Sequence, residues 1–319
     1  MSEEVKFSII IRCFNEELHI ARLLTGISRQ TETDYEIILV DSGSTDATLS
    51  IASQYPVKIV YISPEEFSFG RALNRGCREA SGEFLVFISA HCYPVYNDWL
   101  KCLTEPFKDP RVALSYGRQI GDLTTQFSEH RVFSAWFPPQ SDFCKKDPFC
   151  NNANAAIRKS LRNEISYNED ITGLEDLSWA KQALEKGYLI AYSAKAEIVH
   201  VHNETPGQVK NRYRREAMAL KSIFPSQSFS LWDFFHLFFR NMLSDSSAAI
   251  KEHVFLKNFK PIVTFRFMQF WGTYKGFSSK EGLTTQLRRT FYYPKTFSGS
   301  EISSDTQTRE HIDYSNLRK

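Results

Sequence analysis

The chain has 319 residues, of which 42% are hydrophobic and 24% charged, a composition that excludes an intrinsically disordered protein. Its net charge of +2 is too small to predict nucleic-acid binding by bulk attraction. No uninterrupted apolar run approaches the roughly 18 residues that a membrane-spanning helix needs. The six cysteines are dispersed without CxxC spacing and do not indicate a zinc site. With no recognisable secretory signal, the expected location is the cytoplasm, with reduced thiols.

Apolar runs and helical patterns alternate over the first 90 residues. Four short runs are rich in β-branched residues, as strands buried on both faces are. They cover residues 7–11, 35–40, 57–61 and 83–88. Helical segments lie between them, so the order predicts βαβ units and a mainly parallel sheet flanked by helices. Ligands of such sheets bind at the carboxyl ends of the strands. Polar clusters follow three of the runs, at residues 12–16, 41–44 and 89–91.

The middle of the chain is less regular. Strands are expected near residues 111–118 and 151–157, with a helix over residues 173–186. Residues 190–202 are expected to form an edge strand. Residues 120–150, rich in Phe, Pro and polar groups, have the composition of an irregular loop on the acceptor side.

The composition shifts near Pro225. Beyond it, residues 231–239 and 262–271 are rich in aromatic residues and have the pattern of amphipathic helices. Such helices suit either a membrane interface or packing against protein. We therefore expect three parts, which are a domain over residues 1–225, a helical extension over residues 226–297 and a loose polar tail over residues 298–319.

Four motifs, in order along the chain, resemble those of family 2 glycosyltransferases, the inverting enzymes with a GT-A fold. The first strand and its turn read SIIIRCFNEE at residues 8–17, and the nucleotide-binding motif reads DSGSTD at residues 41–46. The segment before the next motif reads FGRALNRG at residues 69–76, and an acidic pair lies in GLED at residues 173–176. The resemblance extends over about residues 5–215. It implies a GT-A, Rossmann-like α/β domain with a mainly parallel mixed sheet.

The resemblance places a nucleotide at the carboxyl ends of the first strands. The residues that it assigns to nucleotide binding are Arg12, Phe14, Glu17, Asp41, Ser42, Arg71 and Ser89. A carboxylate at Asp41 suits a nucleobase N–H, and the amides of the following turn suit an anion. The motif taken alone favours an ordinary turn and helix cap. The order of the four motifs favours nucleotide binding.

Asp176 and Glu175 are the expected catalytic residues. By resemblance, Asp176 is the general base, which takes the proton of the acceptor hydroxyl as that oxygen attacks the anomeric carbon. Glu175 then binds the acceptor or orients the loop. Acidic residues are also common in the first turn of a solvated helix, so the motif order again decides the interpretation.

Ser89-Ala90-His91 stands where the family carries Asp-x-Asp, which holds a divalent metal on the donor diphosphate. Imidazole suits manganese, iron or zinc better than magnesium. A manganese or magnesium cofactor is therefore in doubt, and weak or absent metal dependence is expected because a hard cation needs carboxylates. Four readings of His91 stay open. It ligates a metal with help from His200 or His202, it pairs with the diphosphate as a cation, its site is inactive, or it makes a structural hydrogen bond.

His202 matches a histidine that the family often carries near the metal or diphosphate. An exposed histidine pair on an edge strand fits the same pattern equally well. Lys210 and Arg214, from the basic helix that follows, are expected diphosphate cations, although a solvated helix face is as consistent with the sequence.

The sequence thus predicts inverting transfer of a sugar from a nucleotide-sugar donor to a hydroxyl of a glycan or lipid-linked glycan, in bacterial surface polysaccharide synthesis. One alternative is a degenerate GT-A protein that binds glycan or a partner without catalysis. Another is a sugar-1-phosphate nucleotidyltransferase, which the lack of a glycine-rich loop after the first strand disfavours. The C-terminal helices are expected to contact the inner face of the membrane or a second copy of the chain.

Overall fold

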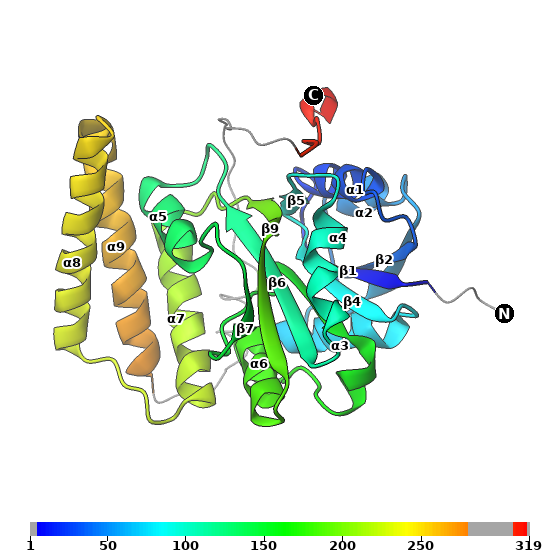
Figure 1. The fold of residues 1–319 in the computed structure, drawn as a ribbon. Coiled ribbons are helices and arrows are strands. Elements are labelled where there is room, and N and C mark those ends of the chain that lie inside the picture. The colour runs from blue at the N-terminus through cyan, green and yellow to red at the C-terminus, as the bar shows by residue number, and fades with distance from the viewer. Residues whose placement is uncertain (1–4, 280–308, 318–319) are drawn as a thin grey trace.

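A computed structural model describes residues 5–279 and 309–317 (Figure 1). The strands are β1 (Phe7–Cys13), β2 (Tyr35–Asp41), β3 (Val57–Tyr61), β4 (Phe84–Ser89), β5 (Cys92–Pro94), β6 (Val112–Ile120), β7 (Asp142–Lys145), β8 (Asn154–Arg158) and β9 (Leu189–His200). The α-helices are α1 (Ile20–Ser28), α2 (Thr48–Ala52), α3 (Phe69–Glu79), α4 (Trp99–Thr104), α5 (Phe127–Trp136), α6 (Glu175–Glu185), α7 (Pro206–Ile223), α8 (Leu231–Lys251) and α9 (Phe255–Phe277). Short 3₁₀ helices cover Glu105–Lys108, Lys159–Asn163 and Ser315–Leu317.

The strands form one mixed sheet in the order β3-β2-β1-β4-β8-β6-β9-β5, with β7 also paired to β9. Strands β1 to β4 run parallel, β8 runs antiparallel to β4 and β6, and β9 runs parallel to β6. The carboxyl ends of β1, β2, β4, β6 and β9 therefore lie at one edge of the sheet. Ligands of parallel sheets bind at this edge. The predicted α/β fold with a mainly parallel sheet is confirmed.

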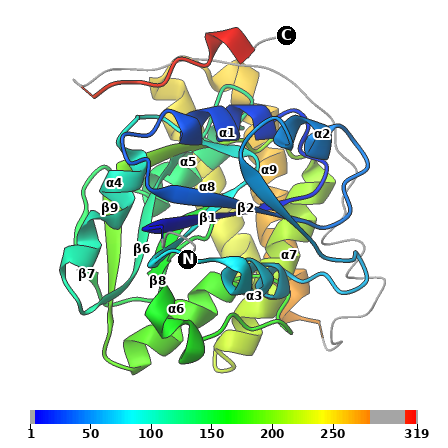
Figure 2. The same cartoon turned by 90° about the vertical axis from the view of Figure 1, so that its right-hand side faces the viewer.

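Alternate residues of the central strands pack into two separate hydrophobic layers, one on each face of the sheet. In β1, Ile10 faces one layer while Ile9 and Ile11 face the other, as the period of two along a strand requires. Figure 2 shows α1 and α2 on one face and α3 and α6 on the opposite face. Both faces are covered, which explains why the strand sequences are continuous apolar runs.

Two expectations for the middle of the chain are wrong. Strand β9 is not an edge strand, because β6 pairs with one side of it and β5 and β7 pair with the other. Residues 120–150 are not an irregular loop, because they contain α5 and β7. Helix α5 packs against α8 and α9, and this contact with a distant segment cannot be read from the local sequence.

Helices α7, α8 and α9 stack beside the sheet (Figure 1). Close approach of α9 to α7 needs glycine, because a Cβ at Gly272 would lie 2.4 Å from the carbonyl oxygen of Lys210, and one at Gly276 would lie 2.5 Å from that of Arg214. None of the helices in the described part of the chain is both long and apolar enough to span a bilayer. The C-terminal helices are thus present as predicted, while the domain boundaries at residues 225 and 297 stay predictions.

Residues 309–317 are docked, contrary to the expectation of a loose tail. Tyr314 donates a hydrogen bond from its hydroxyl to the carbonyl of Pro94 at 2.7 Å, and Ile312 pairs its backbone N–H with Val95 at 3.0 Å. Arg309 binds the carboxylate of Asp98. These contacts lie against β5 and the start of α4. The remaining tail residues, 298–308 and 318–319, lie outside the described part of the structure.

Candidate active site

Two turns at the carboxyl edge of the sheet are joined by hydrogen bonds. The turn after β1 contributes Asn15, whose side-chain oxygen accepts from the backbone N–H of Thr45 at 2.8 Å. Asn15 has a φ of +52°, which asparagine tolerates better than most residues. Glu17 accepts from the backbone N–H of Ala47 at 2.9 Å. The expected nucleotide-binding residue Glu17 therefore holds the second turn in place.

Asp41 ends β2 and is fully buried, at 1% exposure. Its carboxylate accepts from the backbone N–H groups of Gly43 at 3.0 Å and Ser44 at 3.1 Å. Gly43 has a φ of +95°, which explains why glycine occupies that position. The hydroxyl of Ser42 donates to the carbonyl of Cys13 at 3.2 Å. Asp41 and Ser42 thus build the turn, and their contacts with a nucleotide stay a prediction.

The other expected nucleotide-binding residues surround these turns. Ser89 ends β4 in register with Arg12 of β1, and half-buried Phe14 follows directly after β1. Arg71 donates from Nε to Glu169 at 2.8 Å and from Nη1 to the carbonyl of Glu66 at 2.6 Å. The hydrogen bond to Glu169 raises the pKa of Arg71, so this guanidinium is a permanent cation at the rim of the site.

The acidic pair begins α6 and is buried, with Glu175 at 5% and Asp176 at 7% exposure. Arg12 donates to Glu175 at 3.0 Å and stacks its guanidinium 4.8 Å from the ring centre of Phe69. Asp176 accepts from the backbone N–H of Asn152 at 2.9 Å. Burial first, and then the charge of Glu175, raises the pKa of Asp176 to about 7. A carboxylate with a pKa near neutrality suits a proton acceptor at physiological pH.

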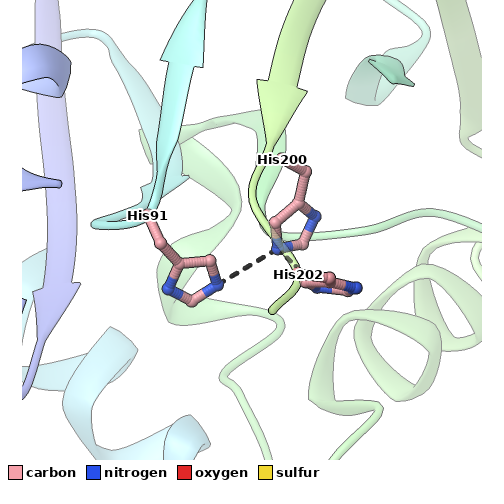
Figure 3. A group of neighbouring side chains, drawn as sticks. All are labelled: His91, His200 and His202. Atoms are coloured by element: carbon pink, nitrogen blue, oxygen red, sulfur yellow. Dashed lines mark hydrogen bonds between the residues drawn. The ribbon is translucent and has the colours of Figure 1, made fainter. Parts of the chain in front are cut away.

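Three histidines meet at the carboxyl ends of β4 and β9, and we call them the histidine cluster (Figure 3). Nε2 of His91 lies 3.1 Å from Nε2 of His200, and Nε2 of His202 lies 2.9 Å from the same atom. His200 is buried, whereas the side chains of His91 and His202 retain 34% and 14% exposure. The sequence analysis named His91 and His202 as expected site residues and His200 as a possible further ligand, and the structure places His200 at the centre of the cluster.

Each histidine of the cluster is held from behind through its Nδ1 atom. His91 binds Glu16, His200 binds the side-chain oxygen of Gln119, and His202 binds Glu129, all at 2.7 Å. Glu16, Gln119 and Glu129 come from the turn after β1, from β6 and from α5. None of the three was an expected site residue. Glu16 lies in the motif at residues 8–17 but received no role of its own, and Gln119 and Glu129 become relevant only through contacts across the fold.

Burial and neighbouring charges shift the pKa values of the cluster and of its partner Glu129 in different directions. Burial first, and then the neighbouring His202 and His91, lowers the pKa of His200 well below its usual value. Burial also lowers the pKa of His91, but the Glu16 carboxylate outweighs it and the net shift is upward. Burial opposes ionisation of Glu129, yet Arg212 and His202 outweigh it and lower its pKa to about 2. The lowered pKa of His200 therefore favours the neutral form of the central imidazole.

Arg212 is the cation of α7 that contacts the carboxylates beside the histidine cluster. The expected cations were Lys210 and Arg214. The Nη2 atom of Arg212 lies 2.5 Å from Glu129 and 2.6 Å from Glu204. Lys210 and Arg214 lie one turn apart on the helix face whose backbone packs against α9. Their role as diphosphate cations stays a prediction.

One turn connects the two groups of candidate catalytic residues. Arg12 contacts the acidic pair, and Glu16, four residues later, contacts the histidine cluster.

A surface cavity of about 760 Å³ lies at the opposite edge of the sheet, lined by Lys6, Asp34 and Arg158 among others, and no expected site residue lines it. The carboxyl edge is therefore the candidate active site.

The histidine cluster is also the place to test for the metal that the resemblance implies. Its donor set is three imidazole nitrogens, with no carboxylate from the end of β4. Imidazole suits manganese, iron, cobalt or zinc and is a poor ligand for magnesium. Hydrogen-bond partners on every Nδ1 are the usual outer support of metal-binding histidines. The residues present fit a transition-metal ion and do not fit magnesium.

Comparisons with known proteins agree with this geometry. Residues 8–166 match the family model described as glycosyl transferase family 2. The O-antigen chain rhamnosyltransferase WbaN of Salmonella anatum is 32% identical over 199 residues, which are 59% of this chain and 63% of the relative. The O-antigen chain rhamnosyltransferase RfbN of Salmonella typhimurium is 29% identical over 66% of this chain and 70% of the relative. The chain thus spans about two thirds of the length of these relatives.

Among solved structures, the mannosyltransferase PcManGT from Pyrobaculum calidifontis, in complex with GDP-Man and Mn²⁺, superposes with a TM-score of 0.60. It is 19% identical, and the match covers 88% of this chain and 89% of that one. A mycobacterial protein superposes with a TM-score of 0.52 at 19% identity, over 70% of this chain and 76% of that one. These similarities show a shared GT-A fold.

Proposed function

The chain belongs to the family 2 glycosyltransferases, and on that premise we propose that it transfers a sugar, with inversion, from a nucleotide-sugar donor to a hydroxyl of a glycan or lipid-linked glycan. The observation that carries the proposal is the burial of Asp176 beside Glu175, which raises the pKa of Asp176 to about 7. A carboxylate in that state can take a proton from an acceptor hydroxyl at neutral pH.

In the proposed mechanism, Asp176 removes the proton of the acceptor hydroxyl as its oxygen attacks the anomeric carbon. The bond from that carbon to the diphosphate oxygen breaks on the opposite face, so the configuration inverts. Glu175 accepts a hydrogen bond from Arg12 and orients the acceptor beside the base. The nucleotide lies along the turns that contain Arg12, Glu17 and Asp41, with Arg71 at the rim.

The leaving diphosphate carries negative charge that the site must offset. The position of the family's metal motif is occupied here by His91, at the end of β4. A divalent ion held by the histidine cluster would supply positive charge to the diphosphate as it departs. Arg12 and Arg71 are the guanidinium groups on the nucleotide side, and each is paired with a carboxylate, of Glu175 and Glu169 respectively. Lys210 and Arg214 remain further candidates.

The proposed acceptor class is supported by the relatives. Two are named for the O-antigen chain. A third, from Campylobacter jejuni, is named as a glucosyltransferase acting on a GalNAc(5)-diNAcBac-PP-undecaprenol glycan, and it is 26% identical over 66% of this chain and 70% of that relative. A lipid-linked acceptor would be presented at a membrane surface, so a protein that acts on it benefits from an apolar face.

Helix α8 carries such an exposed face. Trp232, Phe235, Phe239 and Leu243 recur at helical spacing on one side of the helix, with exposures of 76%, 46%, 51% and 62%. Exposed basic residues lie on α8, at Arg240 and Lys251, and on α9, at Lys257 and Lys260. Apolar side chains flanked by basic ones are typical of helices that lie in the interface of an anionic membrane. We assign the α8 face to contact with the membrane that carries the acceptor.

The double variant Trp232→Ser/Phe235→Ser is expected to bind anionic vesicles at least about tenfold more weakly than the native chain. Burying one Phe-sized side chain contributes about 1.5–3 kcal/mol, and 1.4 kcal/mol is tenfold in affinity. Co-sedimentation with phosphatidylglycerol-containing vesicles measures it. Trp136→Ser on α5, which removes an equally large side chain of 53% exposure, is the control and should bind normally. Equal binding by all three proteins, with a dimer of the native chain in ultracentrifugation, would assign the face to a second copy instead.

A donor-hydrolysis screen tests the proposed function. Purified protein is incubated with a panel of nucleotide sugars in the presence of manganese, of magnesium or of chelator, and released nucleoside diphosphate is measured. We expect slow hydrolysis of one donor class. Failure of every nucleoside diphosphate to bind in calorimetry, with or without manganese, would favour the degenerate, non-catalytic alternative.

A further inference from the structure

The Nε2 atoms of the histidine cluster point at one another rather than at separate partners (Figure 3). Two of the separations from His200 are 3.1 Å and 2.9 Å, and all three ligand atoms lie within 4.8 Å of one another. Three side chains from two strand ends and the loop after β9 are thus directed to one point. That convergence needs a chemical reason.

The partners behind the rings determine which nitrogen carries the proton. The carboxylates of Glu16 and Glu129 accept hydrogen bonds from Nδ1 of His91 and His202, and the side-chain oxygen of Gln119 accepts from Nδ1 of His200. Each Nδ1 is therefore protonated, because its partner atom can only accept. In the neutral form of each ring, Nε2 then presents a lone pair.

Lone pairs of His91 and His202 that face the lone pair of His200 at 3.1 Å and 2.9 Å repel it unless something positive lies between them. One proton can bridge a single pair of nitrogens, and the third ring would still present its lone pair to the others. A metal ion can accept all three at once. The outer hydrogen bonds also match the arrangement that orients metal-binding histidines and raises their basicity.

We propose that the histidine cluster is a resident binding site for a divalent transition-metal ion of the manganese, iron, cobalt or zinc class, and that the ion binds the protein before any nucleotide sugar does. Two ligand nitrogens about 2.1 Å from one ion lie about 3.0 Å apart in octahedral geometry and about 3.4 Å apart in tetrahedral geometry, so the separations of 3.1 Å and 2.9 Å need little change to hold one ion. The cluster is preassembled, so ligand ordering adds little cost on binding.

The cluster selects against magnesium, which prefers oxygen ligands. All three donors are imidazole nitrogens. Of the nearby carboxylates, those of Glu16 and Glu129 bind the histidines from behind. The carboxylate of Glu204, within 4.8 Å of the ligand atoms of His202 and Glu129, is paired with Arg212. Glu129 is also neutralised by Arg212 at 2.5 Å. The chain therefore replaces a carboxylate site for a hard ion with an imidazole site for a softer one.

Three protein ligands leave coordination positions for water or substrate oxygens, as in catalytic metal sites. The side chains of His91 and His202 are 34% and 14% exposed, so the cluster is accessible to solvent on the side of these two residues. That diphosphate oxygens take those positions rests on the proposed function. Binding of the ion itself does not.

The experiment uses the full chain without a polyhistidine tag, stripped with chelator and freed of it by gel filtration. Cobalt, zinc, manganese and magnesium are titrated separately in calorimetry with no nucleotide present, and the cobalt form is examined for visible absorption. We expect one cobalt or zinc ion per chain, bound at least about tenfold more tightly than magnesium.

Two variants and a control localise the ion. Gln119→Met removes the partner of the central ring with little change in volume and should weaken cobalt binding about 10–100-fold, the usual effect of losing an outer partner. His91→Asn removes a ligand on the exposed side and should weaken it further. His236→Asn, at an exposed position on α8, should bind cobalt as the native chain does. Circular dichroism checks that each variant is folded.

The outcomes separate this inference from the proposed function. Absence of stoichiometric binding by any of the three transition ions, in a folded protein that still transfers sugar in chelator, would overturn the metal site and leave the transferase intact. Cobalt binding that both variants weaken, in a protein that accepts no nucleotide sugar, would support the site and contradict the transferase. Equal binding by native chain and variants would place the ion elsewhere and overturn the inference.

Discussion

Asp176→Asn is expected to lower the transfer rate by about 10²–10⁴-fold, the range that a positioned general base contributes. The substitution preserves the shape of the side chain, and its one remaining oxygen can still accept from the backbone N–H of Asn152, at 2.9 Å in the native chain. It removes the proton acceptor and the second contact of the carboxylate, with the backbone N–H of Leu177 at 2.8 Å. Donor affinity should therefore stay within about twofold while kcat falls. Assays of sugar transfer at timed intervals measure kcat, and calorimetry with the nucleoside diphosphate measures its affinity.

The pH dependence provides the internal control for this assignment. Because Asp176 must be ionised to act as base, kcat/KM should rise with pH and level off above a pKa of about 7. Glu175→Gln removes a charge that raises this pKa, so the rising limb of the plot of kcat/KM against pH should move to lower pH. Arg12→Gln removes a charge that lowers it and should move the limb to higher pH. Full activity of Asp176→Asn, or a limb that neither variant moves, would assign the base to another residue.

Local sequence was enough to predict the part of the site that lies at strand ends. Asp41, Ser89 and His91 each follow a recognisable apolar run, and parallel strands bring their carboxyl ends together. The acidic pair at residues 175 and 176 was identifiable as a helix start. Its burial was not, because it depends on Arg12 of β1 and on Asn152 of the turn before β8.

The residues that support the histidine cluster could not be predicted from the sequence, because they lie far from the histidines along the chain. Gln119 lies 81 residues from His200, and Glu129 lies 73 residues from His202. Neither occupies a motif, and α5 lies in a segment that was expected to be irregular. The choice of Arg212 over Lys210 and Arg214 depends on which face of α7 is covered by α9, and only the packing of Gly272 and Gly276 decides that.

The same helix α5 ties the active site to the C-terminal helices through one buried carboxylate. Asp245 of α8, at 1% exposure, binds Arg266 of α9 at 2.7 Å and Arg131 of α5 at 2.8 Å. Arg266 is itself 4% exposed. Glu129, which supports His202, lies two residues before Arg131. The position of α5, and with it one wall of the histidine cluster, therefore depends on this ion network.

Asp245→Asn is accordingly expected to lower the free energy of unfolding by about 3–5 kcal/mol, because it leaves the buried guanidinium of Arg266 without its counter-charge. The midpoint of urea unfolding measures the loss. Glu185→Gln, the same change in an exposed pair with Lys181 on α6, is the matched control and should cost less than about 1 kcal/mol. Similar small losses in both variants would mean that water reaches Arg266, and that the helical extension is held to α5 by apolar packing rather than by charge.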